Sequence, residues 1–319
     1  MRRGPPRSGS PNIPRSGTSN PPRSGPSKAP RGGFSNTPHG GPSNPSRGGP
    51  KGPAPHAPPR APRHSPHGGP DRAGPRVAGL PSGGGVWLHG LHAVAAALGN
   101  PARRLRRLLL TAEAETALAA RLPGPWRIAA ERVERGQLAG LLAEDAVHQG
   151  VALLAEPLPA MPLDRALEHG HGPVLVLDQV TDPRNVGAIL RSAAAFGAAA
   201  LVLQDRHAPP ETGALARAAS GALELVPVVR EVNLARAIDA LKKAGLWVVG
   251  LAGEAPVTLA QAGLGGRRVA LVLGAEGEGM RRLTREHCDE LCRLPIAPEM
   301  ESLNVSAAAA VALYELARG

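Results

Sequence analysis

Cysteine, aromatic side chains and long apolar runs are all scarce in this chain of 319 residues. No stretch of about 18 consecutive apolar residues occurs, which excludes a membrane-spanning helix of ordinary length. The apolar centre of a secretory signal segment is also missing, so the sequence predicts a soluble, cytoplasmic protein without a membrane partner. The chain has only three Trp, one Tyr and two Phe residues, which leaves few side chains for recognising nucleic-acid bases by stacking.

The two cysteines, Cys288 and Cys292, lie four residues apart in a stretch whose pattern predicts a helix. Two thiols cannot by themselves complete the four-ligand set of a structural zinc site. We therefore expect no metal and no disulfide, and we expect at least one of the two thiols to be an inert core residue.

Residues 1–85 consist mainly of Pro, Gly, Ser, Arg and Asn, with almost no aliphatic side chains. Such a segment cannot bury enough apolar surface to offset the entropy of ordering it, so the tail is predicted to be disordered. Short units such as residues 6–9 and 14–17 recur every eight residues in its first half. These units lack the apolar positions of a packed solenoid and indicate a solvated tether.

The positive charge of the chain is concentrated in this tail. The tail holds 13 of the 37 Lys and Arg residues and one acid, Asp71, whereas the remainder holds 24 bases and 25 acids. A flexible cationic arm suits sequence-independent contact with nucleic-acid phosphates and would make that binding salt-dependent. A solubilising extension without a specific role explains the composition equally well.

Residues 86–156 are predicted to form a small α/β module. Short apolar runs at residues 86–89, 107–110 and 151–154 alternate with helical patterns such as residues 137–147. Three prolines within residues 157–162 then interrupt regular structure. We expect a linker at 157–171 between this module and a second one at 172–319.

The second module alternates predicted strands and helices. Residues 174–180 form a nearly continuous apolar run, typical of a strand covered on both faces, and Asp182 and Pro183 then supply a helix N-cap and a first helical proline. That helix should end at Gly197. Further strands are predicted at 200–203, 246–251, 269–273 and 294–296, and a helix at 234–244. A last helix is predicted at the chain end, with one apolar face marked by Val305, Ala309, Ala312, Leu313 and Leu316. The predicted fold class is α/β with a parallel, doubly wound sheet.

A dinucleotide-binding site would place clustered glycines at the first turn from strand to helix. Residues 179–187 lack that cluster. Glycines instead gather late, at Gly274, Gly277 and Gly279, with Glu276 and Glu278 among them. Carboxylates repel phosphate but accept hydrogen bonds from hydroxyl and ammonium groups, so a ribose or a cationic sulfonium cofactor fits better than a nicotinamide dinucleotide.

Three segments of the second module carry the residues that point to a family. They are residues 178–197 with Asn185 and Arg191, the loop from Gly274 to Gly279, and residues 294–306. In this order they resemble the three motifs of the SpoU (TrmH) family of RNA 2'-O-ribose methyltransferases. Residues 86–98 resemble the start of the small RNA-recruiting domain of many members, and the nearest likeness is to the subgroup that methylates a guanosine ribose of large-subunit (23S) ribosomal RNA.

The resemblance implies a SPOUT fold, in which the C-terminal segment of a parallel sheet is threaded into a trefoil knot that holds S-adenosylmethionine. It places cofactor contacts at the backbones of Gly274, Leu294, Ile296 and Leu303, with support from Gly277. Leu and Ile side chains can flank an adenine while their N–H and C=O groups contact its edge. The resemblance also implies a homodimer.

Methyl transfer to a ribose 2'-hydroxyl needs a site that shares its proton and stabilises negative charge on oxygen. The resemblance assigns that role to Arg191, which we interpret as a stabiliser of the oxyanion because arginine is hard to deprotonate. Asn185 would position Arg191 or the ribose, Ser302 and Asn304 would orient the hydroxyl and the RNA backbone, and Glu276 would fix Arg191 or Asn185.

Several alternatives stay open at this point. Ser302 and Asn304 have the residue types of helix caps, and capping is compatible with a functional role. The substrate could be transfer RNA in place of ribosomal RNA, since the near-neutral body favours neither. The chain could also be a non-catalytic RNA-binding protein, an alternative that loss of Asn185 or Arg191 would have favoured.

Overall fold

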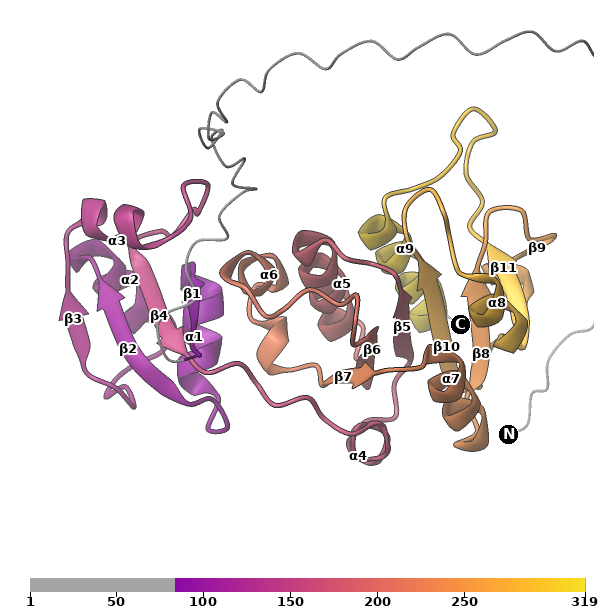
Figure 1. Cartoon of the computed structure of the whole chain (residues 1–319), viewed down its shortest axis with the longest axis horizontal. Coiled ribbons are helices and arrows are strands. Elements are labelled where there is room, and N and C mark those ends of the chain that lie inside the picture. The colour runs from indigo at the N-terminus through magenta and orange to yellow at the C-terminus, as the bar shows by residue number, and fades with distance from the viewer. Residues whose placement is uncertain (1–83, 319) are drawn as a thin grey trace, which may run out of the picture. The chain divides into compact units, whose positions relative to one another are not determined.

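The computed structural model describes residues 84–318, and the predictions made for the tail fall outside the described residues apart from its last two positions. Figure 1 shows the described elements in chain order. Their bounds are β1 (Val86–His89), α1 (Leu91–Gly99), β2 (Leu105–Leu110), α2 (Ala112–Arg121), β3 (Ala130–Arg132), α3 (Arg135–Leu141), β4 (Val151–Ala155), α4 (Leu163–His169), β5 (Val174–Asp178), α5 (Pro183–Ala195), β6 (Ala200–Gln204), α6 (Gly213–Ala219), η1 (Ala222–Glu224), β7 (Val228–Glu231), α7 (Leu234–Lys243), β8 (Trp247–Leu251), β9 (Val257–Thr258), η2 (Leu259–Gln261), β10 (Val269–Gly274), α8 (Arg282–His287), β11 (Glu290–Arg293) and α9 (Val305–Arg318).

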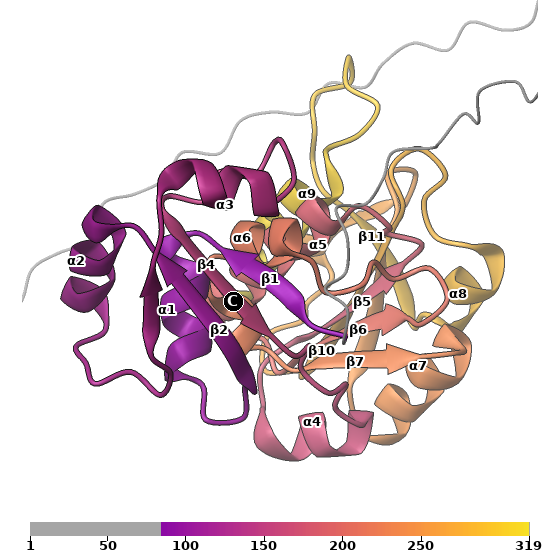
Figure 2. The same ribbon diagram turned by 60° about the vertical axis from the view of Figure 1, so that its left-hand side comes forward.

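The first elements form a small module around a four-stranded sheet of order β1-β4-β2-β3 (Figure 2). Strand β4 pairs antiparallel with β1 and β2, while β3 joins β2 in parallel. Side chains alternate between the faces of a strand, so Leu108 and Leu110 belong to the core shared with α1 and α2. Leu109 packs on the other face with Leu138 of α3.

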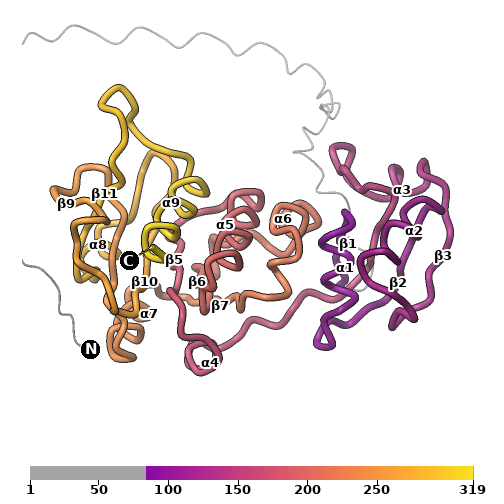
Figure 3. The backbone as a smooth tube through the Cα atoms, turned by 180° about the vertical axis from the view of Figure 1, so that it is seen from behind, coloured from indigo at the N-terminus to yellow at the C-terminus, as the bar shows by residue number. Residues whose placement is uncertain are grey.

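The later elements surround a seven-stranded sheet of order β7-β6-β5-β10-β8-β11-β9. Every pairing in it is parallel, as the alternation of strands and helices predicted. The two faces have separate cores: Leu175 and Leu177 pack with α5, α6 and α9, whereas Val174 and Val176 pack with α4 and α7. Figures 1 and 3 show these helices from opposite sides of the sheet. The continuous apolar run in β5 follows from this double coverage.

The order of the strands creates a switch point beside β5. The chain passes from β5 to β6 and β7 in one direction, then returns to the opposite side, where β10 pairs with β5 in register. The last residues of the two strands, Asp178 and Gly274, are direct partners. Ligand sites of doubly wound sheets form at such switch points, outside the carboxyl ends of the strands.

The helix after β5 begins as its sequence predicted. The Asp182 side chain accepts a hydrogen bond from the Arg184 N–H, and Pro183 occupies the first helical position. The helix ends at Ala195, and Gly197 follows with a positive φ of 67°. The predicted buried face of the last helix is also correct at Val305, Ala309, Ala312 and Leu313.

Three local predictions were wrong. Cys288 and Cys292 do not share a helix, because α8 ends at His287 and Cys292 lies in the buried strand β11. The helix expected over 137–147 covers only Arg135–Leu141, since residues 142–150 turn back into β4. The short strand expected at 294–296 lies earlier in the chain, at Glu290–Arg293, and ends one residue before the expected start.

A buried ionic cluster joins the small module to the large sheet. The side chain of Arg103, which is fully buried, pairs with both Glu211 and Glu224 and donates to the Glu156 carbonyl at 2.9 Å. Burial raises the pKa of Glu211, and the nearby Arg103 charge opposes that rise. The Leu158 N–H also donates to Glu211, at 3.0 Å. The predicted linker is therefore fastened at its start, and α4 occupies its second half.

Candidate active site

Glu276 joins the three sequence motifs at the carboxyl edge of the large sheet. It lies in the loop after β10, and its Oε1 atom accepts hydrogen bonds from Asn304 Nδ2 at 2.6 Å and Asn185 Nδ2 at 3.2 Å. The same oxygen accepts from the backbone N–H of Val305, the first residue of α9, at 3.1 Å. Asn304 Nδ2 also lies 3.1 Å from Asn185 Oδ1. The structure thus brings together three of the five predicted catalytic residues.

Asn304 acts as the N-cap of α9 as well as a member of this cluster. Its Oδ1 accepts from the N–H groups of Ser306 at 2.9 Å and Ala307 at 3.4 Å, while its Nδ2 faces Glu276 and Asn185. The amide oxygen therefore caps the helix, while the amide nitrogen of the same side chain binds the cluster. The capping and functional interpretations of Asn304 are therefore compatible.

The glycine-rich loop is closed by contact between its own ends. Ala275 and Gly279 exchange backbone hydrogen bonds of 3.1 and 3.0 Å, which leaves residues 276–278 as the tip. A Cβ on Gly274 would lie 2.0 Å from the Gly279 carbonyl carbon, so this close approach excludes any side chain there. Gly277 at the tip has a φ of 83°, in the region where glycine is favoured.

Asp178 was not among the predicted site residues, yet it anchors this loop. Its side chain is completely buried at the end of β5, where Oδ1 accepts from Arg281 Nε at 2.7 Å and Oδ2 from the Arg281 N–H at 2.9 Å. The sequence carried one signal for it. An acid that directly ends an apolar run covered on both faces must find a partner, because an unpaired buried charge is costly.

Arg191 and Ser302 do not join the cluster. Asn185 and Arg191 are six positions apart on α5, which separates them by roughly 120° around a helix of 3.6 residues per turn. Arg191 is exposed and makes no hydrogen bond or ion pair with any of residues 84–318. Ser302 is exposed two residues before the N-cap, also without a hydrogen bond to the described chain.

Three predicted cofactor contacts lie on the segment between β11 and α9. Leu294 and Ile296 are half-buried and Leu303 is 37% exposed. Within the described part of the chain, their backbone N–H and C=O groups have no hydrogen-bond partner. Leu294 packs on the core that includes Leu273 and Val305. Free backbone groups beside apolar side chains match the edge and faces of an adenine, so this donor set fits S-adenosylmethionine.

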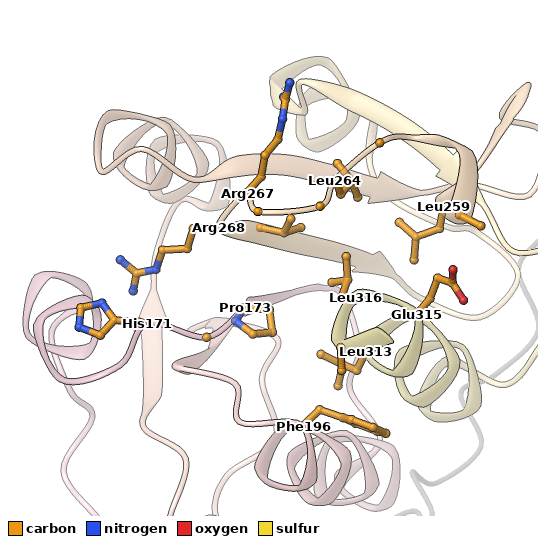
Figure 4. A pocket seen from close by; sticks show the side chains of 17 residues that line it. His171, Pro173, Phe196, Leu259, Leu264, Arg267, Arg268, Leu313, Glu315 and Leu316 are labelled. Carbon is orange, nitrogen blue, oxygen red and sulfur yellow. The ribbon is translucent and has the colours of Figure 1, made fainter. Parts of the chain in front are cut away.

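Two cavities of the structure lie elsewhere. One, of about 260 Å³, is at the amino ends of β5 and β10, where Pro173, Leu264, Leu313 and Leu316 contribute to its wall (Figure 4). The other, of about 650 Å³, is lined by residues 157–161 and by parts of α5, α6 and β7. Neither of these two cavities is lined by a predicted site residue. In the motif cluster, Glu276 and Asn304 are exposed at the surface.

The thiols give no sign of reactivity. Burial raises the pKa of both Cys288 and Cys292 to about 11, so neither is a thiolate at neutral pH. Cys292 is fully buried, as the core interpretation predicted. Among residues 84–318 no group of three or more His, Cys, Asp or Glu side chains is arranged to hold a metal ion. No helix in the same range is long and apolar enough to cross a membrane.

Comparison with known proteins agrees with these motifs. Residues 172–314 match the SpoU rRNA Methylase family, and residues 87–161 match the family described as RNA 2'-O ribose methyltransferase substrate binding. The chain is 42% identical over 241 residues to the 23S rRNA (guanosine-2'-O-)-methyltransferase RlmB of Pseudomonas syringae pv. tomato, covering 72% of this chain and 94% of that protein. The chain belongs to the SpoU rRNA methylase family.

A second relative and a solved structure are also similar to this chain. RlmB of Pasteurella multocida is 44% identical over 239 residues, which cover 72% of this chain and 97% of that protein. Among solved structures, the SpoU methyltransferase AviRb of Streptomyces viridochromogenes in complex with AdoMet aligns with a TM-score of 0.61 at 24% identity, covering 74% of this chain and 90% of that one. This structural likeness supports the fold alone.

Proposed function

We propose that this chain transfers a methyl group from S-adenosylmethionine to the ribose 2'-oxygen of a guanosine in 23S ribosomal RNA. The observation that carries the proposal is the joining of Asn185, Glu276 and Asn304, one from each motif, in a chain 42% identical to an enzyme named for this reaction. The names of relatives above 40% identity favour ribosomal RNA over transfer RNA. The presence of Asn185 and Arg191 also disfavours a purely RNA-binding role.

The residues that would hold S-adenosylmethionine come from two segments that also contribute to the motif cluster. Leu294, Ile296 and Leu303 offer free backbone groups on the segment that ends at Asn304, and Gly274 and Gly277 belong to the loop that carries Glu276. The bound cofactor supplies an electrophilic methyl group on a sulfonium. The task of the chain is to hold the ribose hydroxyl in line with that methyl group and to exclude competing water.

The cluster can orient a ribose without providing an obvious base. Glu276 fixes the amides of Asn185 and Asn304 by charge-assisted hydrogen bonds, so their remaining groups are preorganised toward the substrate. Arg191 would stabilise negative charge on the 2'-oxygen, and Ser302 would contact the RNA backbone. Because Arg191 lies apart from the cluster in one chain, we propose that it acts on a substrate bound across two subunits.

A homodimer would supply that second subunit. Arg191 on α5 is exposed, and α9, which contacts α5, exposes 46% of Val311 and 56% of Tyr314. A subunit interface over this face of α9 would cover both side chains, and aromatic residues are enriched in such interfaces. Light scattering tests the proposal by the expected mass of about twice 32.7 kDa. The trefoil knot stays a prediction from the family resemblance, and the cytoplasmic location stays a prediction from the sequence.

We propose that residues 86–156 recruit the RNA and residues 172–319 carry out methyl transfer. The decisive experiment is transfer from radiolabelled S-adenosylmethionine to separate pools of unmodified 23S and transfer RNA, with ribose-methyl mapping of the product. We expect label at a 2'-O-methylguanosine of 23S RNA, and its loss in Arg191→Ala. Label in transfer RNA alone would replace the proposed substrate, and no label in either pool would reject the proposed activity.

A further inference from the structure

The glycine-rich loop that presents Glu276 is held at its far end by a single buried carboxylate. Asp178 ends β5 and pairs in register with Gly274, where the loop begins. Its two oxygens bind the backbone N–H and the Nε of Arg281, where the loop ends. One side chain therefore spans both ends of the segment 274–281.

The loop has few other attachments. The Ala275–Gly279 hydrogen bonds close its neck, and Met280, 5% exposed, packs into the core beneath it. Glu276 at the tip contacts the start of α9 and the amide of Asn185. The Asp178–Arg281 pair anchors the base of this loop, and its hydrogen bonds to a charged group are about twice as strong as the neutral hydrogen bonds that close the neck. The hydrogen bonds that Glu276 accepts hold the tip separately.

We propose that Asp178 and Arg281 form a positioning pair that sets the loop for S-adenosylmethionine binding, an inference that rests on the proposed function. Asp178 is fully buried and contacts no substrate, so it acts through the loop. The Arg281 side chain, 38% exposed, covers the carboxylate from the solvent side. The pair is assigned to cofactor binding, whereas RNA recruitment is proposed for residues 86–156.

The test compares cofactor affinity with RNA affinity in the full-length chain. Asp178→Asn preserves shape and removes the charge, and we expect the Kd for S-adenosylmethionine, measured by titration calorimetry, to rise about tenfold. The Kd for transcribed 23S RNA, measured by filter binding, should be unchanged. Arg281→Lys keeps a positive charge and the backbone hydrogen bond to Asp178, so it should restore part of the affinity that Arg281→Gln loses.

Arg282→Gln provides the matched control, at the position next to Arg281. Arg282 is exposed and, among residues 84–318, pairs only with Glu286, at 2.6 Å, so its loss should leave cofactor affinity unchanged. If Asp178→Asn does not fold, Arg281→Gln gives the same comparison at a partly exposed position. Variants that lose thermal stability but keep the wild-type Kd for S-adenosylmethionine would overturn the inference. A wild-type chain that binds no S-adenosylmethionine would overturn the proposed function as well.

Discussion

A single amide at Asn304 connects the start of α9 with the predicted catalytic cluster. Its oxygen accepts hydrogen bonds from the N–H groups of Ser306 and Ala307, and its nitrogen donates to the Glu276 and Asn185 side chains. A cap needs only a short side chain with an acceptor, so the two functions of Asn304 can be separated by substitution.

Asn304→Ser should keep the cap and lose the cluster contacts, whereas Asn304→Ala should lose both. We expect the Ala variant to unfold with a free energy about 1 kcal/mol below wild type and the Ser variant to stay near wild type. Methyl transfer should fall about tenfold or more in both variants. Urea denaturation and single-turnover assays check the two effects. Full activity in the Ser variant would reduce Asn304 to a cap.

His89 is a buried histidine of the small module. It is 6% exposed against α6, where a Cβ on Gly213 would lie 2.5 Å from the imidazole, and its Nδ1 has no partner in the described chain. Burial, followed by the positive charge of Arg217, lowers its pKa below 6.5. His89 is therefore neutral in the folded protein at neutral pH.

When the pKa of a histidine is lower in the folded state than in the unfolded state, the folded state binds fewer protons. This difference appears once the pH falls below the ordinary histidine pKa of about 6.5. The contribution of such a histidine to stability is thus present at pH 7 and is lost as the pH falls through about 6.5 toward the folded pKa. We expect the free energy of unfolding of wild type, relative to His89→Gln, to decrease over this range in urea titrations. A difference that does not change with pH would contradict the buried neutral state.

At the scale of elements, the loop after β10 needs its glycines for different reasons. Gly274 has no room for a side chain because the backbone of Gly279 and Met280 occupies the position, whereas Gly277 has free space and a positive φ. A clash with backbone forces the loop open, while a positive φ in an alanine costs only about 1–2 kcal/mol.

Gly274→Ala should therefore damage the site more than Gly277→Ala. We expect the first variant to lose measurable binding of S-adenosylmethionine and the second to retain it with weaker affinity. Calorimetric titration of both variants, after circular dichroism has established that each is folded, provides the comparison. Equal affinities in the two variants would mean that the close approach at Gly274 does not shape the site.

At the scale of the whole molecule, Arg103 connects the small module with the sheet that carries the cluster. Its fully buried guanidinium pairs with Glu211 and Glu224, whose side chains are only 10% and 5% exposed. Removing one partner of a buried ion pair leaves the others charged without compensation.

Arg103→Met should destabilise the protein by about 3–5 kcal/mol, because two buried carboxylates lose their shared cation. Adding Glu211→Gln and Glu224→Gln should recover part of this loss. Arg165→Met, which removes an exposed pair with Glu168, should leave the free energy of unfolding almost unchanged. Thermal and urea unfolding measure all three. An Arg103 variant as stable as the Arg165 variant would show that the cluster does not hold the modules together.

The sequence by itself determined the parallel sheet, the start of α5 and the buried face of α9. Each follows from short-range chemistry: an apolar run, an Asp-Pro helix start, or apolar residues at helical spacing. The sequence-based prediction of a helix around Cys292 was wrong, because Cys292 lies in β11, a strand of four residues. So short a segment takes its conformation from its neighbours β8 and β9, and local propensity does not decide it.

The motifs likewise supplied Asn185, Glu276 and Asn304 as site residues, but only the tertiary structure decided that they touch one another and that Arg191 and Ser302 stand apart. Arg281 and Arg103 became visible only in three dimensions, and so did the partner that the buried Asp178 requires. The physical reason is that each makes contacts across about 100 or more positions of the chain. The sequence specifies the residue types, whereas the order of the strands brings their partners within hydrogen-bond distance.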